Sequence, residues 1–166
     1  LHKAIRRQRQ MCIRDRPERM QLVVRGYNDG FAFCYKIPDG KGPCVNVQSE
    51  LTAYNFAGDY TAWFYNGENH NIGPEKLTET DGTRLPVMTV KAGDKHYMAI
   101  HEACLETGAP LVLQSKGGES LFSVASKPTS LSPGYTSAWR VVLYGTTPGV
   151  LTDSHLLAVS YTHLTL

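Results

Sequence analysis

The chain has 166 residues, of which 42% are hydrophobic and 19% are charged, and its formal net charge is +2. This length suits one domain with a sizeable core, or part of a larger one. No apolar run approaches the roughly 20 residues that a membrane-spanning helix needs. The cysteines form no CxxC pair and their spacing is irregular, which argues against a zinc site of that type and against a disulfide framework.

The two ends do not read as evolved protein. Residues 6–16, RRQRQMCIRDR, match one translated frame of a common transposase-type sequencing adaptor, and residues 159–166, VSYTHLTL, resemble its reverse complement. We therefore expect residues 1–16 and 158–166 to be adaptor-derived and to stay outside the fold, and residues 17–157 to hold the domain without its natural N-terminus.

This exclusion changes the charge argument. Residues 1–16 carry six Lys or Arg and one Asp, whereas residues 17–157 carry eleven Lys or Arg against fourteen Asp or Glu. The domain is therefore acidic, with a net charge of −3, and the basic character belongs to the N-terminal end. No basic stripe remains that would follow a nucleic-acid backbone, so we expect no nucleic-acid partner.

Short segments with alternating or aromatic side chains, separated by turn signals, predict strands along most of the chain. Asn28-Asp29-Gly30 predicts a hairpin with a longer loop, residues 66–84 read as a long polar surface loop, and residues 127–137 read as a connector. Strands are expected at residues 22–25, 31–37, 45–54, 61–65, 87–91, 96–103, 111–114, 121–125 and 139–144. Many short strands with little helix favour an all-β fold, an antiparallel β-sandwich.

The strand at residues 95–105, KHYMAIHEACL, carries the most informative side chain. Alternation places Glu102 on the same face as Met98 and Ile100, and His101 on the opposite face. A carboxylate among apolar neighbours needs a cation, a hydrogen-bond donor or access to solvent at the strand end. Glu102 is therefore the main candidate for a functional residue.

Standard catalytic templates are absent from the sequence. There is no GxSxG elbow, phosphate-binding GxxxxGK[ST] loop or GxGxxG turn, and His101-Glu102 lacks the second histidine of the HExxH zinc motif. Glu50 is expected to be a solvated strand position. Trp63 and Trp139 are expected in the core, with sugar stacking as the alternative. Each of four aspartates sits in or beside a turn, which its side chain stabilises: Asp29, Asp59, Asp81 and Asp94.

Four motifs in order resemble the N-terminal domain of glycoside hydrolase family 97. They are the hairpin YNDGFAF at residues 27–33, the strand HEACL at 101–105, the strand AWRVV at 138–142, and residues 144–157, where Leu151 and Ser154 stand in matching places. Together they cover nearly all of residues 17–157. The sequence departs from the family pattern at Cys34, Ala138, Asp153 and His155, which leaves the sub-family and the substrate open.

The resemblance implies a fragment of a large bacterial enzyme, periplasmic or secreted, that hydrolyses α-glucosidic or α-galactosidic bonds of an oligosaccharide. The resemblance implies three domains in the whole enzyme: a galactose-mutarotase-like β-supersandwich, a central (β/α)8 barrel and a C-terminal β domain. The paired catalytic carboxylates come from the barrel. The resemblance therefore implies an incomplete sandwich that contains no catalytic residue and that braces the missing barrel.

The resemblance also implies one metal ligand. An active-site calcium in the family is held mostly by barrel glutamates, and Glu102 matches the one glutamate that the N-terminal domain adds. Ca²⁺ binds six to eight oxygen ligands, so a carboxylate at a domain boundary suits it. In the alternative interpretation, Glu102 is bonded internally to backbone or to a cation such as Arg140.

Two other functions remain open. A stand-alone carbohydrate-binding β-sandwich would use Trp63 or Trp139 as a platform for a sugar ring. A mutarotase-like isomerase would need His101 and Glu102 in one cleft, which their opposite directions along a strand disfavour.

Overall fold

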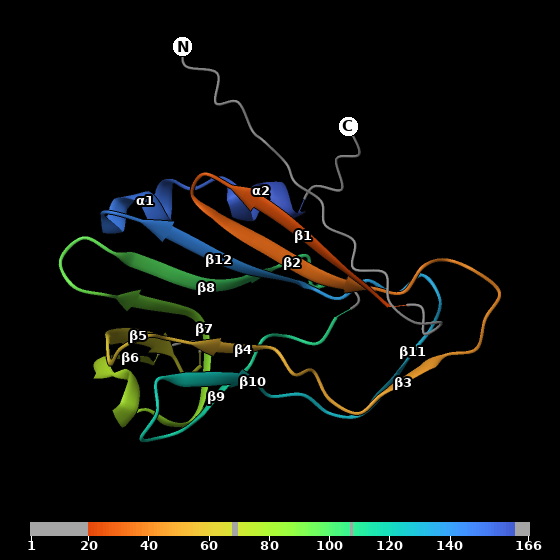
Figure 1. Ribbon diagram of the computed structural model, residues 1–166, viewed down its shortest axis with the longest axis horizontal. Coiled ribbons are helices and arrows are strands. Elements are labelled where there is room, and N and C mark those ends of the chain that lie inside the picture. The colour runs from red at the N-terminus through yellow and green to blue at the C-terminus, as the bar shows by residue number, and fades with distance from the viewer. Residues whose placement is uncertain (1–19, 68–69, 107, 162–166) are drawn as a thin grey trace, which may run out of the picture.

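The computed structural model describes residues 20–67, 70–106 and 108–161, which form an all-β fold with two short helices near the C-terminal end (Figure 1). The strands are β1 (Gln21–Tyr27), β2 (Gly30–Lys36), β3 (Val45–Val47), β4 (Ala53–Asn55), β5 (Thr61–Tyr65), β6 (Asn71–Lys76), β7 (Asp81–Lys91), β8 (Tyr97–Ala103), β9 (Leu113–Lys116), β10 (Leu121–Val124), β11 (Thr129–Leu131) and β12 (Trp139–Gly145). The helices are α1 (Pro148–Asp153) and α2 (Leu156–Tyr161), with a 3₁₀ turn at Leu77–Glu79.

The strands form one strongly curled antiparallel sheet. Its order is β1-β2-β12-β8-β7-β9-β10-β4, with β5 and β6 joined to the side of β7. A separate ribbon of β3 and β11 extends away from the sheet (Figure 1). The all-β antiparallel prediction is confirmed, and the curl gives the sheet the shape of a half-barrel.

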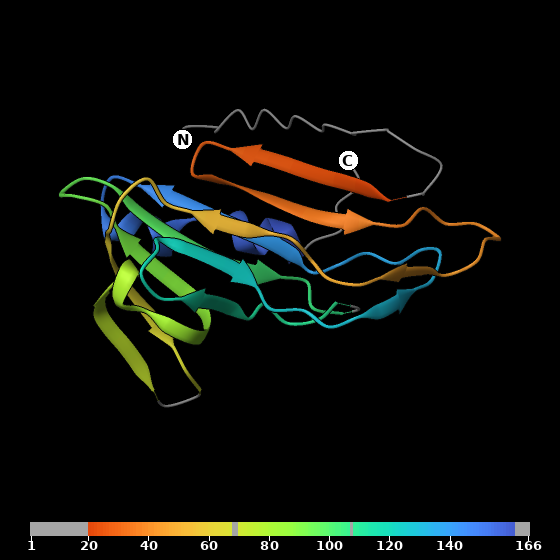
Figure 2. The same cartoon turned by 60° about the horizontal axis from the view of Figure 1, so that its bottom comes forward.

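The curl depends on β7, the longest strand. Its C-terminal half, from Met88 to Lys91, pairs with β8, and its N-terminal half, from Asp81 to Arg84, pairs with β9. The strand thus passes from one layer to the other, and β4 and β10 lie in front of the β8 layer in Figure 2. The apolar core between the layers contains Ala62, Phe64, Leu77, Met88, Val90, Ile100, Leu111, Leu113, Phe122 and Val124.

A second core lies on the other face of the sheet, where α1 and α2 cover β2, β12 and β8. It contains Ala32, Cys34, Ala99, Ala103, Cys104, Trp139, Val141, Leu143 and Leu156. The predicted domain boundary after residue 157 falls inside α2. In the adaptor-like segment, Ser160 is 2% exposed and its hydroxyl donates to the Leu156 carbonyl at 2.8 Å. Residues 1–16 and 162–166 lie outside the described residues.

The β1–β2 hairpin is confirmed, but its loop is shorter than predicted. Tyr27 pairs directly with Gly30, so only Asn28 and Asp29 form the turn. Gly30 has φ +148°, and a Cβ there would lie 2.1 Å from the Val142 carbonyl oxygen. Glycine at this position therefore allows β2 to pack closely against β12.

Four other predictions of local structure were wrong. Residues 127–137 are not a plain connector, because β11 lies within them and pairs with β3. Residues 45–54 are not one strand: β3 belongs to the ribbon and β4 to the main sheet. Residues 66–84 are not an open loop, because β6, the 3₁₀ turn and the start of β7 fall there, and both Leu77 and Thr80 are fully buried. The two helices were not predicted, since six residues each are too few for a clear helical period.

Candidate functional site

The sheet brings three charged side chains together on its inner face. Arg140 on β12 lies directly opposite Glu102 on β8 in the strand register. Its guanidinium makes a two-point contact with Glu50, from Nε to Oε1 at 3.1 Å and from Nη2 to Oε2 at 2.7 Å. Its third nitrogen, Nη1, lies 3.6 Å from Glu102 Oε2. One guanidinium therefore faces two carboxylates.

Glu102 is on the predicted face but in a different environment from the one expected for a metal ligand. Its residue is 8% exposed, and the Leu111 N–H donates to Oε2 at 2.5 Å. The antiparallel register sets Arg140 beside this carboxylate. The ion pair supports the alternative of internal bonding and leaves the metal role a matter of proposal.

Glu50 was missed as a site residue. The prediction of a solvated strand position was wrong, because the segment between β3 and β4 turns its carboxylate inward to Arg140. Thr52 Oγ1 donates to Glu50 Oε1 at 2.8 Å, and the Glu50 N–H donates to Ser126 Oγ at 2.7 Å. Arg140 lies 90 residues away along the chain, so no local pattern could have revealed the pair.

Electrostatics keep Arg140 charged although it is 3% exposed. Burial acts to lower the pKa of the guanidinium, but the hydrogen bond and the charge of Glu50 outweigh it and hold the pKa above its usual value. For the neutral side chains of Tyr54 and Tyr135, burial instead raises the pKa, so their hydroxyls remain protonated. Arg140 Nη1 and the Tyr54 hydroxyl are buried without a hydrogen-bond partner among the described residues.

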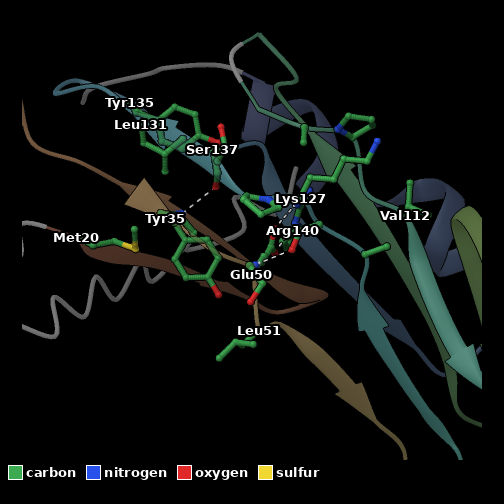
Figure 3. Close-up of a pocket in the computed structure, with 18 residues that line it drawn as sticks. Met20, Tyr35, Glu50, Leu51, Val112, Lys127, Leu131, Tyr135, Ser137 and Arg140 are labelled. Carbon is green, nitrogen blue, oxygen red and sulfur yellow. Dashed lines mark hydrogen bonds and ion pairs between the residues drawn. The ribbon is translucent and has the colours of Figure 1, made fainter. Parts of the chain in front are cut away.

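A cavity of about 880 Å³ opens beside this cluster. Figure 3 shows Arg140 and Glu50 joined inside it, with Tyr35 held nearby by Ser137, whose Oγ accepts the Tyr35 N–H at 2.9 Å. Much of the wall is apolar and comes from loops of both layers and from the ribbon: Met20, Val47, Leu51, Pro110, Val112 and Leu131. Polar side chains, among them Ser126, Lys127 and Thr129, also line it. The cavity combines a few converging polar groups with apolar walls, as ligand and docking sites do.

The remaining candidates lie outside this cluster. His101 lies on the opposite face of β8 from Glu102, with Ala99 and Ala103, so the two residues do not share a cleft.

Trp139 is 5% exposed and its ring is covered by the Arg25 guanidinium at 4.4 Å, whereas Trp63 is 37% exposed. Asp29 lies in the β1–β2 turn as expected, but its carboxylate accepts a 2.6 Å hydrogen bond from the distant Ser154 Oγ. Among the described residues, no three His, Cys, Asp or Glu side chains converge as a metal site would require.

Solved structures of similar fold come from glycoside hydrolases. A family 97 enzyme from Pseudoalteromonas sp. strain K8, in complex with acarbose, is 18% identical with a TM-score of 0.70, and the match covers 94% of this chain and 29% of that one. The same enzyme in complex with panose gives the same values. A β-arabinopyranosidase matches at 15% identity and TM-score 0.64, over 76% of this chain and 25% of that one. At these identities the likeness shows the fold, and this chain spans less than a third of each structure.

No curated protein is similar enough to this chain to give a match. In the part that the structure describes, no helix is long and apolar enough to cross a membrane. The family described as Glycosyl-hydrolase 97 N-terminal matches residues 3–159, which takes in part of both adaptor-like ends. Since this match spans nearly the whole sequence and the fold agrees, the chain belongs to the glycosyl-hydrolase 97 N-terminal domain family.

Proposed function

We propose that this chain is part of the N-terminal domain of an enzyme that hydrolyses α-glucosidic or α-galactosidic bonds. In that enzyme it braces a (β/α)8 barrel and contributes Glu102 to a calcium ion. The family match over residues 3–159 carries the proposal. The match covers 29% of the relatives solved with acarbose and panose, which leaves room for a catalytic barrel outside this chain, and the proposal assigns the catalytic residues to that barrel.

The charge balance around Glu102 supports the calcium role. Glu50 and Glu102 together carry two negative charges against the single positive charge of Arg140, so the buried cluster has a net charge of −1. A nearby cation is electrostatically favourable in such surroundings. A bound calcium ion supplies a fixed positive charge that holds oxygen ligands in place. Glu102 would be one ligand, and the others would come from the barrel.

Arg140 is the competitor for the same carboxylate. Its Nη1 lies 3.6 Å from Glu102 Oε2, which is an ion-pair contact rather than a hydrogen bond. The carboxylate therefore has no two-point contact with the guanidinium, the arrangement that would hold it most firmly. The oxygens of the Glu102 carboxylate suit a hard cation such as calcium. The ion would bind on the side of the carboxylate that faces away from Arg140.

Calcium titration of the complete enzyme tests the proposal. Glu102→Gln keeps the shape of the side chain and removes its charge, and we expect it to weaken calcium affinity by at least tenfold. The matched control is Glu106→Gln, the same change at an exposed glutamate beyond the end of β8. Isothermal calorimetry measures both, and equal affinities in wild type and Glu102→Gln would eliminate the ligand role.

A stand-alone carbohydrate-binding module is the second candidate, supported by the exposure of Trp63. Trp139 is not available to a sugar ring, because it is buried under Arg25. We expect no saturable change in Trp63 fluorescence when maltose or panose is added to this chain. A saturable change that Trp63→Ala abolishes would favour the binding module over the enzyme fragment.

A further inference from the structure

We propose that Glu50 is a positioning residue for Glu102: it holds Arg140 back from Glu102 and so keeps that carboxylate available to a cation. This inference rests on the proposed calcium role of Glu102. It assigns a role to Glu50 and to its two-point contact with Arg140, which crosses the inner face of the sheet.

The strand register alone would predict a different pair. Arg140 and Glu102 are direct partners across β12 and β8. Side chains at such positions have Cβ atoms roughly 4.5–5.5 Å apart, within easy reach of each other. An arginine and a carboxylate so placed would ordinarily form the two-point pair that their shapes favour. Glu102 would then be neutralised by its neighbour.

In the structure, Arg140 makes its two-point contact with Glu50 instead of Glu102. Arg140 directs Nε and Nη2 to Glu50, at 3.1 and 2.7 Å, and only Nη1 faces Glu102, at 3.6 Å and without a hydrogen bond. Glu102 Oε2 accepts the Leu111 N–H instead. The guanidinium is therefore near enough to act on Glu102 through its charge but is held in an orientation that does not chelate it.

Glu50 is itself held in place by neighbours that fix its carboxylate. Thr52 Oγ1 lies 2.8 Å from Glu50 Oε1 and 2.9 Å from the Tyr35 hydroxyl, and the Glu50 N–H is bonded to Ser126 Oγ at 2.7 Å. These contacts attach the segment before β4 to β2 and to the loop after β10. The carboxylate that restrains Arg140 is thus bonded directly by Thr52, while Tyr35 holds Thr52 and Ser126 holds the Glu50 backbone, an outer network of the kind that commonly supports metal ligands.

Removing the charge of Glu50 has two effects in the same direction. The cluster changes from a net charge of −1 to neutral, which lowers its attraction for a cation. Arg140 also loses its two-point partner and turns to Glu102, the nearest remaining carboxylate. Glu102 then leaves the Leu111 N–H, which loses its acceptor.

The Leu111 amide gives a test on this chain that does not depend on calcium. In Glu50→Gln we expect hydrogen exchange of the Leu111 amide to become about tenfold faster than in wild type, relative to amides in the centres of β8 and β12. Glu75→Gln is the matched control, since it removes the carboxylate partner of Arg84 at a distant pair. Acceleration of all core amides by one factor would show general destabilisation and overturn the positioning role.

Thr52→Val provides a second variant in case Glu50→Gln folds poorly. It leaves every charge in place and removes only the hydroxyl that orients Glu50. We expect selective acceleration at Leu111 again, by a smaller factor. An unchanged exchange rate of the Leu111 amide in either variant, provided that it is folded, would refute the inference.

Calcium calorimetry on the complete enzyme separates this inference from the function on which it rests. We expect Glu50→Gln to weaken calcium affinity by about tenfold, within the range seen for outer partners of metal ligands, and Glu75→Gln to leave it unchanged. If Glu102→Gln also weakens binding but Glu50→Gln does not, the positioning role is wrong and the ligand role stands. If Glu102→Gln has no effect, the proposed function fails first, whatever Leu111 shows.

Discussion

Replacing Arg140 with methionine should destabilise the fold more than any other single charge change in the described structure. The substitution keeps much of the side-chain volume but leaves Glu50 and Glu102 facing each other without a cation. Their side chains are only 17% and 10% exposed, so solvent screens this repulsion poorly. Both hydrogen bonds to Glu50 are also lost.

The expected magnitude follows from the burial. Removing one member of a buried ion pair costs about 3–5 kcal/mol. Because Glu50 retains some contact with solvent, we expect the lower end, about 3 kcal/mol. For a chain of this size each kcal/mol lowers the melting temperature by roughly 2–4 °C, so the shift should be about 6–12 °C.

Urea unfolding followed by circular dichroism measures the free-energy change directly. The matched control is Arg84→Met, at the pair with Glu75, where the side chains are 13% and 21% exposed and the separation is 3.3 Å. Among the described ion pairs Arg84 faces a single carboxylate, so its removal leaves no two like charges facing each other, and we expect a smaller loss than for Arg140→Met. If Arg140→Met and Arg84→Met lose equal stability, the inner cluster is not the buried ionic centre described here. The double variant Arg140→Met/Glu50→Gln should recover part of the loss, since one unpaired carboxylate is removed.

Three further outcomes are expected. Gly30→Ala should lower the melting temperature by more than 10 °C, because the new Cβ would lie 2.1 Å from the Val142 carbonyl oxygen; a shift below 3 °C would contradict the close packing of β2 on β12. Burial raises the pKa of Cys34 to about 11, so between pH 9 and about 11 the folded chain keeps the thiol proton while the unfolded chain loses it. The free energy of unfolding should therefore fall as the pH rises through this range. Cys34→Ala should weaken that fall in urea titrations. Among the described residues β1 is an edge strand of the sheet. We expect this edge to make the isolated chain self-associate, and a monodisperse monomer in sedimentation analysis would instead favour a stand-alone module.

The fold could be predicted from the sequence to the extent that it depends on local pattern. Strict alternation located β8 and placed Glu102 on the same face as Met98 and Ile100, as observed. The polar strand β6 was not predicted, because it lies at the side of the sheet, where four of its six residues are exposed and no alternation of side chains is required. The break between β3 and β4 was not predicted, because the segment between them turns inward to Arg140, a residue far away in the sequence.

The candidate site was predictable only in part, for the same reason. Glu102 stands out within its own strand, since a carboxylate among apolar neighbours signals a partner. Glu50 carries no such signal: alternation places it with the polar side chain of Thr52, and its significance arises only when β12 enters the sheet 90 residues later. Long-range ion pairs of this kind are properties of the topology rather than of any segment.

The position of β12 in the sheet has a consequence for how the chain must fold. Within the described part of the chain, the β1–β2 hairpin reaches the rest of the sheet through β12, which pairs with β2 on one side and β8 on the other. Strands β5 to β9 pair with close neighbours in sequence and can assemble early. During synthesis, the hairpin therefore waits for more than a hundred residues before its partner leaves the ribosome. Over that interval its apolar surface lacks its native cover, and surface exposed in this way during folding is prone to aggregation.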